Sequence, residues 1–212
     1  MAFAVMWSGG KDSTLALDRR VRAGRDVRFV FNLYDAESRR VRFHGVRREL
    51  IQRQAEALRM PLLQRPTLPD TFEAVFLDGL RMLQERGVTR IAFGDIHLAD
   101  VRAWYEERTT GLGLGHVEPL WGEEPATLVA ELLGRRYRAI LTSISEPGRR
   151  EWLGRELDAT LAGDITRSGV DPAGEHGEYH TFVFDGPLFT NAIAVLPGDV
   201  VEAEGHAQID LV

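Results

Sequence analysis

A run of six residues, Ser8-Gly-Gly-Lys-Asp-Ser13, combines the residue types that bind phosphate. Its two adjacent glycines permit a tight turn and let the backbone approach an anion without a Cβ clash. Lys11 is the only lysine among the 26 lysine and arginine residues. A compact ammonium on a flexible stem can reach a bound phosphate as a point charge, whereas a guanidinium is planar and wider. The run therefore predicts a nucleotide phosphate site made of Ser8, Gly9, Gly10, Lys11, Asp12 and Ser13.

This run differs from the Walker phosphate loop, which needs a glycine where Val5 stands and a hydroxyl residue where Asp12 stands. An acid beside bound phosphates is expected when it holds Mg²⁺, so Asp12 is the predicted magnesium ligand. Gly94 and Asp95 end a predicted strand and are also expected to face the nucleotide, although Asp95 could instead begin a helix.

A second polar run, Gly174-Glu-His-Gly-Glu-Tyr-His-Thr-Phe182, allows three interpretations. It could be a metal site made of Glu175, His176, Glu178 and His180, or a structural turn that enters a strand. The favoured interpretation is a substrate site. There the two glutamates hold an amine, an ammonium ion or Mg²⁺, and His180 moves protons near neutral pH. The expected substrate contacts are Gly174, His176, Gly177, Tyr179 and Thr181.

Short apolar runs alternate with helical patterns in the first part of the chain. The predicted strands are Phe3–Met6, Val27–Leu33, Leu62–Gln64, Arg90–Phe93 and Ala139–Ser143. The predicted helices between them are Asp12–Ala23, Arg47–Arg59, Asp70–Arg86, Ala99–Arg108 and Ala126–Leu133. This alternation predicts an α/β fold with a doubly wound, parallel five-stranded sheet. Ligands bind such sheets at the carboxyl ends of the strands, which is where both glycine-containing motifs of this half lie.

The pattern changes after about residue 145. A helix is predicted over Trp152–Ala162, followed by strands at Tyr179–Phe184, Ala192–Leu196 and Val200–Ala203 with no helices between them. We therefore expect a phosphate-binding domain at residues 1–145 and a smaller C-terminal α+β lobe for the substrate at residues 146–212. No linker marks the boundary, which could lie as early as about residue 125.

The amino-acid composition limits the classes of function that fit the chain. The net charge of −6 does not favour a nucleic-acid partner. The absence of cysteine excludes disulfides, persulfide sulfur transfer and cysteine-dependent glutaminase chemistry. No signal pattern and no long apolar run are present, so we expect a cytoplasmic protein without a membrane partner. Arg102 lies four residues before Glu106, so it forms either a helical salt bridge or a bidentate contact with a substrate anion.

These motifs resemble those of a known superfamily. Ser-Gly-Gly-Lys-Asp-Ser matches the signature of the PP-loop ATP pyrophosphatases. Gly174-Glu-X-Gly-Glu-Tyr-X-Thr181, followed by Phe184-Asp-Gly-Pro-Leu-Phe189, resembles the diphthine–ammonia ligase family within it. Further similarity is carried by Gly94-Asp-Ile96, Arg102, Trp104, Glu106 and the run from Gly113-Leu114 to Pro119-Leu-Trp121. Phe43-His-Gly45 and Gln54-Ala55 are similar to bacterial-type members.

The resemblance implies a PP-loop (adenine nucleotide alpha hydrolase-like) fold with ATP and Mg²⁺ as cofactors. It implies adenylation of a carboxylate or carbonyl, release of pyrophosphate, and attack by ammonia from ammonium or an ammonia donor. The implied catalytic residues are Lys11, Asp12, Glu175, Glu178 and His180. Eukaryotic and archaeal members tend to have Glu-Gly-Ala at Gly94-Asp-Ile96 and Glu-Thr at His180-Thr181, so the acceptor stays open.

Several alternatives therefore remain. The acceptor could be carried by a protein, as diphthine is, or be a small molecule such as a cobamide-salvage precursor, or be a tRNA. A nucleotide-binding sensor without turnover is a further alternative, and both a monomer and a homodimer are open.

Overall fold

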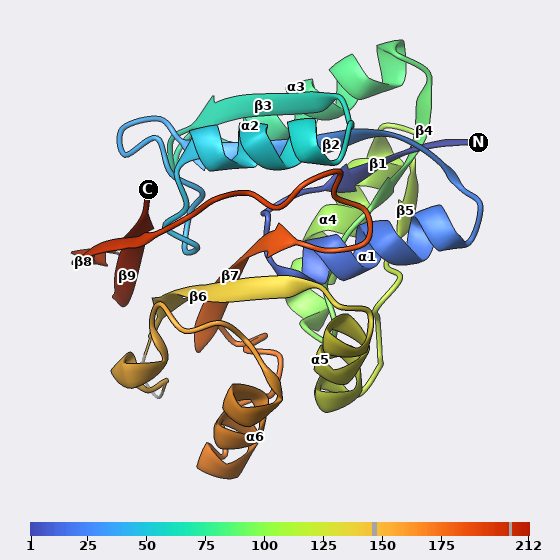
Figure 1. Cartoon of the computed structure of the whole chain (residues 1–212). Coiled ribbons are helices and arrows are strands. Elements are labelled where there is room, and N and C mark those ends of the chain that lie inside the picture. Colours follow the sequence, from blue (N-terminus) through green and yellow to red (C-terminus); the bar gives the residue numbers. More distant parts are fainter. Residues whose placement is uncertain (146–147, 204) are drawn as a thin grey trace.

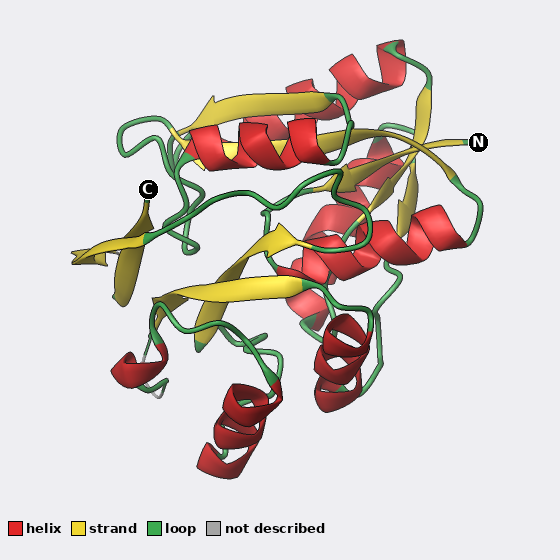
Figure 2. Ribbon diagram, in the orientation of Figure 1, coloured by secondary structure: helices red, strands yellow, loops and turns green. Residues whose placement is uncertain are grey.

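The computed structural model of the chain describes residues 1–145, 148–203 and 205–212. Its first half contains a parallel sheet of five strands in the order β3-β2-β1-β4-β5 (Figures 1 and 2). The strands are β1 (Ala2–Met6), β2 (Asp26–Asp35), β3 (Leu62–Thr67), β4 (Val88–Ala92) and β5 (Gly115–Val117). The order reverses on either side of β1, so the carboxyl end of β1 lies at a topological switch point, where ligands bind in such folds.

Helices cover both faces of this sheet. They are α1 (Lys11–Arg22), α2 (Arg48–Ala57), α3 (Phe72–Glu85) and α4 (Ala99–Gly111). A further helix, α5 (Pro125–Gly134), packs against α1 and against the second lobe. Apolar residues of α3 and α4 pack against one face of the central strands, and those of α1 and α2 pack against the other. The predicted α/β, doubly wound class is confirmed.

A second sheet lies beside the first and has the strand order β7-β6-β9-β8 with antiparallel pairing. Its strands are β6 (Arg138–Ile144), β7 (Tyr179–Asp185), β8 (Pro197–Ala203) and β9 (His206–Leu211). The short helix η1 (Arg150–Trp152) and α6 (Ala159–Ser168) connect β6 to β7. Residue 146, where the second lobe was expected to begin, lies outside the described residues.

The structure corrects three sequence assignments. Residues Ala139–Ser143 do form a strand, but it belongs to the antiparallel sheet, because its buried apolar run would suit the middle of either sheet. The fifth parallel strand is instead β5, which has only three residues and no strong strand pattern. The helix predicted at Trp152–Ala162 starts only at Ala159, because Gly154 has a φ of 77° and the Asp158 carboxylate caps Leu161 N at 2.8 Å.

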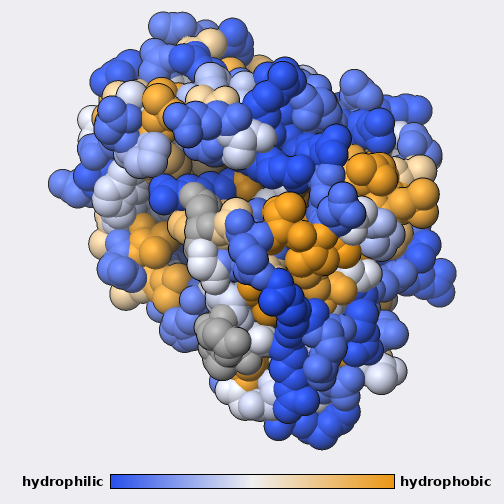
Figure 3. Space-filling model, turned by 90° about the vertical axis from the view of Figure 1, so that its left-hand side faces the viewer, coloured by the Kyte–Doolittle hydropathy of each residue, from blue (hydrophilic) through white to orange (hydrophobic). Residues whose placement is uncertain are grey.

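The third correction concerns the end of the chain. The segment Ala192–Leu196 is not a strand; Ile193 N donates to Phe184 O at 2.8 Å without forming a ladder. The predicted strand Val200–Ala203 is confirmed as part of β8, which pairs with β9, a strand that the sequence pattern did not indicate. The face of the molecule that Figure 3 shows is mainly hydrophilic with apolar groups among the polar ones. No helix of the described residues is long and apolar enough to cross a membrane.

The two sheets share a core. Val5 of β1 and Leu17 of α1 belong to one buried cluster with Ile140 of β6 and Phe182 of β7. In Figure 1, β7 crosses next to the start of α1. The second lobe is therefore packed directly against the phosphate-loop motif of the first.

Candidate functional site

A cavity of about 480 Å³ opens at the carboxyl ends of the parallel strands. The phosphate-loop motif, the end of β4 and the loop before β7 all contribute to its lining. Predicted site residues that line it are Ser8, Lys11, Asp12, Ser13, Gly94, Asp95, Gly174, Glu175 and His180. The structure thus brings together residues that are up to 172 positions apart, counted from Ser8 to His180.

The phosphate loop has the geometry of an anion site. Gly9 has a φ of 82°, which glycine adopts without strain. Gly10 is the N-cap of α1 and makes no side-chain cap hydrogen bond. Ser8 Oγ lies 3.3 Å from Ser13 Oγ, so two hydroxyls face the helix start. Backbone amides and the helix dipole at this end of α1 favour a bound phosphate.

Strand β7 holds this loop in place. Val183 N donates to Gly9 O at 2.9 Å, and Lys11 N donates to Thr181 Oγ1 at 3.0 Å. The buried Gln54 amide bridges the two segments, because its Nε2 donates to Gly9 O at 2.9 Å and to Val183 O at 2.6 Å. Its Oε1 accepts from Trp7 Nε1 at 2.9 Å. Gly9 and Gly10 therefore support the cavity from behind rather than line it.

The end of β4 also lies against the loop. A Cβ on Gly94 would come within 2.9 Å of Asp12 C and of Ser13 N, both backbone atoms. Only glycine permits this approach without a shift of the backbone. Gly94 therefore brings the following residue, Asp95, to the same cavity as Asp12.

Lys11 is almost fully buried, with 5% of its surface exposed. Its Nζ lies 2.8 Å from Asp12 Oδ2 and 4.9 Å from the centre of the Tyr179 ring. Burial alone would lower the pKa of this lysine, but the Asp12 carboxylate, with smaller contributions from Tyr179 and Glu175, raises it. Lys11 is therefore a fixed positive charge at neutral pH.

Three carboxylates crowd the same cavity. Burial, together with the charges of Glu175, Glu118 and Asp12, raises the pKa of Asp95 to about 7. Burial also raises the pKa of Asp12, and Lys11 offsets this only in part. The pKa of Glu175 is raised by burial and by Asp12. Such mutual repulsion is relieved by a bound cation.

These carboxylates suit Mg²⁺, which prefers oxygen ligands and usually takes one or two carboxylates together with phosphate oxygens. Asp12 and Asp95 line the cavity next to the start of α1. The donor set therefore fits a magnesium nucleotide: Asp12 and Asp95 could serve as its ligands, and Glu175 lines the same cavity.

Two histidines at the cavity are neutral. Burial lowers the pKa of His44 to about 4, with Lys11 and His206 adding repulsion. The pKa of His180 is well below its ordinary value, first because of burial and then because of His44, Lys11 and His206. The His44 and His180 ring centres are 4.5 Å apart. His44 Nδ1 lies 3.1 Å from Thr181 O, so Nδ1 carries the proton and donates it.

The neutral histidines predict acid lability. As the pH falls below 6.5, His44 becomes protonated in the unfolded chain, whereas in the folded protein it stays neutral until about pH 4. The free energy of unfolding therefore decreases as the pH falls through this window. Each such histidine costs at most about 1.4 kcal/mol per pH unit, less where the ring is partly exposed. In urea unfolding at about pH 7.5 and about pH 5, His44→Gln should lose about 1–2 kcal/mol less than the parent. An equal loss in both proteins would show that His44 does not contribute.

The remaining predicted site residues all lie in the part of the chain that the structure describes, but they do not line the cavity. They are Gly9, Gly10, Arg102, His176, Gly177, Glu178, Tyr179 and Thr181. Tyr179 is buried, and its OH donates to Pro172 O at 2.6 Å. The Glu178 side chain is buried too, and its Oε2 has no hydrogen-bond partner among the described residues. Thr181 and Tyr179 contact Lys11, and Gly9 is hydrogen-bonded to β7. These three residues therefore hold Lys11 and the phosphate loop in position without lining the cavity.

Arg102 takes part in a separate network. Its Nε lies 3.2 Å from Glu118 Oε2 and 3.6 Å from Glu106 Oε2, and its guanidinium stacks 4.5 Å from the Trp121 ring centre. Glu118 Oε1 also contacts His116 Nε2 at 2.8 Å. The ion pair with Glu106 is one of the two alternatives that the sequence left open.

Sequence reasoning missed two positioning amides. Asn32 lines the cavity, and its Nδ2 donates to Trp7 O at 2.8 Å. The signal was a lone amide inside an otherwise apolar strand, since buried polar groups need partners. Gln54, on the buried face of α2, gave the same signal. In both cases the partner is a backbone group distant in sequence, which no local pattern reveals.

Comparisons with known proteins agree with this architecture. The family model described as the diphthamide synthase N-terminal domain matches residues 1–116. The model described as the diphthamide synthase C-terminal domain matches residues 124–210. The two matches together span most of the chain.

Curated relatives match over nearly the whole length. Diphthine–ammonia ligase of Bos taurus is 29% identical over 98% of this chain and 87% of its own. That of Homo sapiens is 28% identical over 95% of this chain and 85% of its own. A solved structure described as a predicted subunit of tRNA methyltransferase from Methanocaldococcus jannaschii is 16% identical, with a TM-score of 0.48 over 86% of this chain and 96% of that chain. On the two family-model matches, the chain belongs to the diphthamide synthase family.

Proposed function

We propose that the protein is an ATP-dependent ligase that adenylates a carboxylate and then forms an amide with ammonia. The observation that carries this proposal is one cavity shared by the phosphate loop and the Glu175 loop of the second lobe. Family membership and the curated relatives named diphthine–ammonia ligase support the same assignment. A shared cavity holds the nucleotide and both reactants together, which supplies much of the rate acceleration.

In the first step, an oxygen of the acceptor carboxylate attacks the α-phosphorus of ATP. The bond from that phosphorus to the bridging oxygen breaks, and pyrophosphate leaves with the electron pair. Lys11 supplies a fixed positive charge beside the loop that binds the leaving group. Mg²⁺, held by Asp12 and Asp95, would neutralise part of the phosphate charge.

In the second step, the nitrogen of ammonia attacks the acyl carbon. The bond from this carbon to the phosphate oxygen breaks, AMP leaves, and the nitrogen loses a proton. Glu175, a cavity carboxylate whose pKa is raised by burial, binds the ammonia and accepts the proton. His180, whose pKa is well below its ordinary value, lines the same cavity as a neutral polar group rather than as the proton carrier expected from the sequence. The chain has no cysteine for a glutaminase, so nitrogen comes from free ammonium or from a partner.

The acceptor that we propose is diphthine on elongation factor 2 or a related carboxylate. Phe43 and His180 line the cavity, and their rings stack at 6.3 Å between centres. This aromatic and neutral surface suits an acceptor with an apolar or cationic group.

The test is an ATP consumption assay that separates AMP from ADP, with Mg²⁺, ammonium and candidate acceptors that include diphthine-bearing elongation factor 2. We expect AMP and pyrophosphate only when an acceptor is present. Omission of ammonium should stop amide formation while acceptor-dependent exchange of pyrophosphate into ATP continues, because adenylation is the earlier step. Formation of ADP, or exchange that needs ammonium, would contradict the proposed order.

A further inference from the structure

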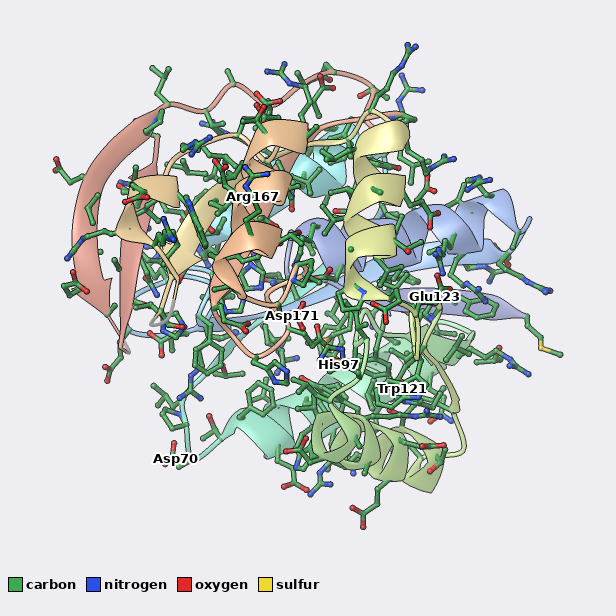
Figure 4. The ribbon with its side chains drawn as sticks, turned by 90° about the horizontal axis from the view of Figure 1, so that it is seen from below. Asp70, His97, Trp121, Glu123, Arg167 and Asp171 are labelled. Carbon is green, nitrogen blue, oxygen red and sulfur yellow. The ribbon has the colours of Figure 1, made fainter. Side chains whose placement is uncertain are left out.

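A second group of ligand-type side chains lies next to the cavity but outside its lining. His97, Asp171 and His176 each offer one ligand atom, and these three atoms lie within 4.8 Å of one another. His97 Nε2 is 3.4 Å from His176 Nε2 and 3.4 Å from Asp171 Oδ2. Figure 4 labels His97 and Asp171 next to each other. The group joins the loop after β4 to the loop before β7.

The spacing of these atoms suits a single metal ion. Zinc lies about 2.0–2.2 Å from histidine nitrogen and carboxylate oxygen, so two ligands in a tetrahedral site are about 3.3–3.6 Å apart. Both distances from His97 Nε2 fall in this range. Two ring nitrogens that face each other need a proton or a cation between them, because two lone pairs repel.

The surroundings support a ligand role. Asp171 Oδ1 accepts from Ala173 N at 2.7 Å, which orients the carboxylate and leaves Oδ2 toward His97. The His97 side chain is 33% exposed and His176 is exposed, so an ion can enter and water can complete its coordination. The sequence pattern also allows a metal site with His176, with Glu175, Glu178 and His180 as the other ligands, whereas in the structure His97 lies beside His176.

We propose that His97, Asp171 and His176 bind one divalent transition-metal ion of the Zn²⁺ class. Two imidazoles favour such an ion over Mg²⁺, which prefers an all-oxygen site such as the cavity carboxylates. Glu175 Oε1 accepts from Ile96 N at 2.8 Å, so residues adjacent to His97 and His176 are already in contact. The ion would fasten the two loops next to this hydrogen bond and fix the position of Glu175.

The test is a Zn²⁺ titration of tag-free, chelator-stripped protein by calorimetry, with excess Mg²⁺ present to occupy the cavity carboxylates. We expect one Zn²⁺ per chain. Loss of a supporting residue behind a ligand costs about 10–100-fold in affinity, so His97→Ala and His176→Ala should each cost about 100-fold or more. His206→Ala is the matched control, because His206 lies with His180 in the other histidine group, at 5.8 Å between ring centres.

A second readout makes the result independent of folding defects. Zn²⁺ should raise the thermal unfolding midpoint of the parent and of His206→Ala, and should not raise it in His176→Ala, whose replaced side chain is exposed. No saturable binding to the parent, affinity retained in both His97→Ala and His176→Ala, or loss confined to His206→Ala would each overturn the proposal. None of these outcomes depends on the ligase reaction.

Discussion

Lys11→Arg is expected to fold normally, and its kcat is expected to fall by about 10²–10³-fold. The charge is retained, but the buried site is shaped for an ammonium, with Asp12 Oδ2 at 2.8 Å and the Tyr179 ring centre at 4.9 Å. A wider, planar guanidinium cannot occupy this position without displacing the ring or the loop. Because the contact strengthens as pyrophosphate leaves, kcat should fall more than the affinity for ATP. Steady-state kinetics and a separate ATP binding measurement distinguish the two effects.

The matched control is Arg138→Lys, the reverse exchange at an exposed ion pair with Glu156. Exposed pairs contribute little, about 0–1 kcal/mol, so its turnover should match that of the parent. Near-normal turnover in Lys11→Arg would mean that a cation of any shape serves at this position. The account of why the chain has a single lysine would then be wrong.

Much of the first half could be predicted from sequence because its signals are local. The two adjacent glycines predict the turn between β1 and α1, and the spacing of the apolar residues predicts the buried face of α3. The convergence of Ser8, Asp12 and Asp95 follows from parallel topology, since the carboxyl ends of neighbouring strands meet at one edge.

The rest depends on tertiary partners that sequence spacing does not encode. The buried pattern of β6 fits two different sheets, and its pairing with β7 is decided by distant residues. The favoured interpretation of the polar run at residues 174–182 assigned all of it to a substrate site. In the structure it divides: Glu175 and His180 line the cavity, Tyr179 and Thr181 support Lys11, and His176 lies near His97.

Gly94→Ala is expected to reduce kcat/KM by about 10- to 100-fold, because misplacement of a binding loop by a fraction of an ångström has effects of this size. The added Cβ would lie 2.9 Å from backbone atoms of Asp12 and Ser13, and neither side can yield by rotating a side chain. The loop must move away from β4, which separates Asp12 from Asp95 and weakens binding of the magnesium nucleotide. Calorimetric titration with Mg-ATP measures this loss directly.

Gly134→Ala is the matched control for that substitution. Gly134 ends α5, and a Cβ there would meet nothing within 4 Å. It should keep parental kinetics and add up to about 0.5–1 kcal/mol to the free energy of unfolding, because alanine loses less backbone entropy in a helix. If Gly94→Ala also kept parental nucleotide affinity, the end of β4 would not position the phosphate loop. Asp95 would then have to reach the nucleotide without that contact, and its assignment as a magnesium ligand beside Asp12 would fail with it.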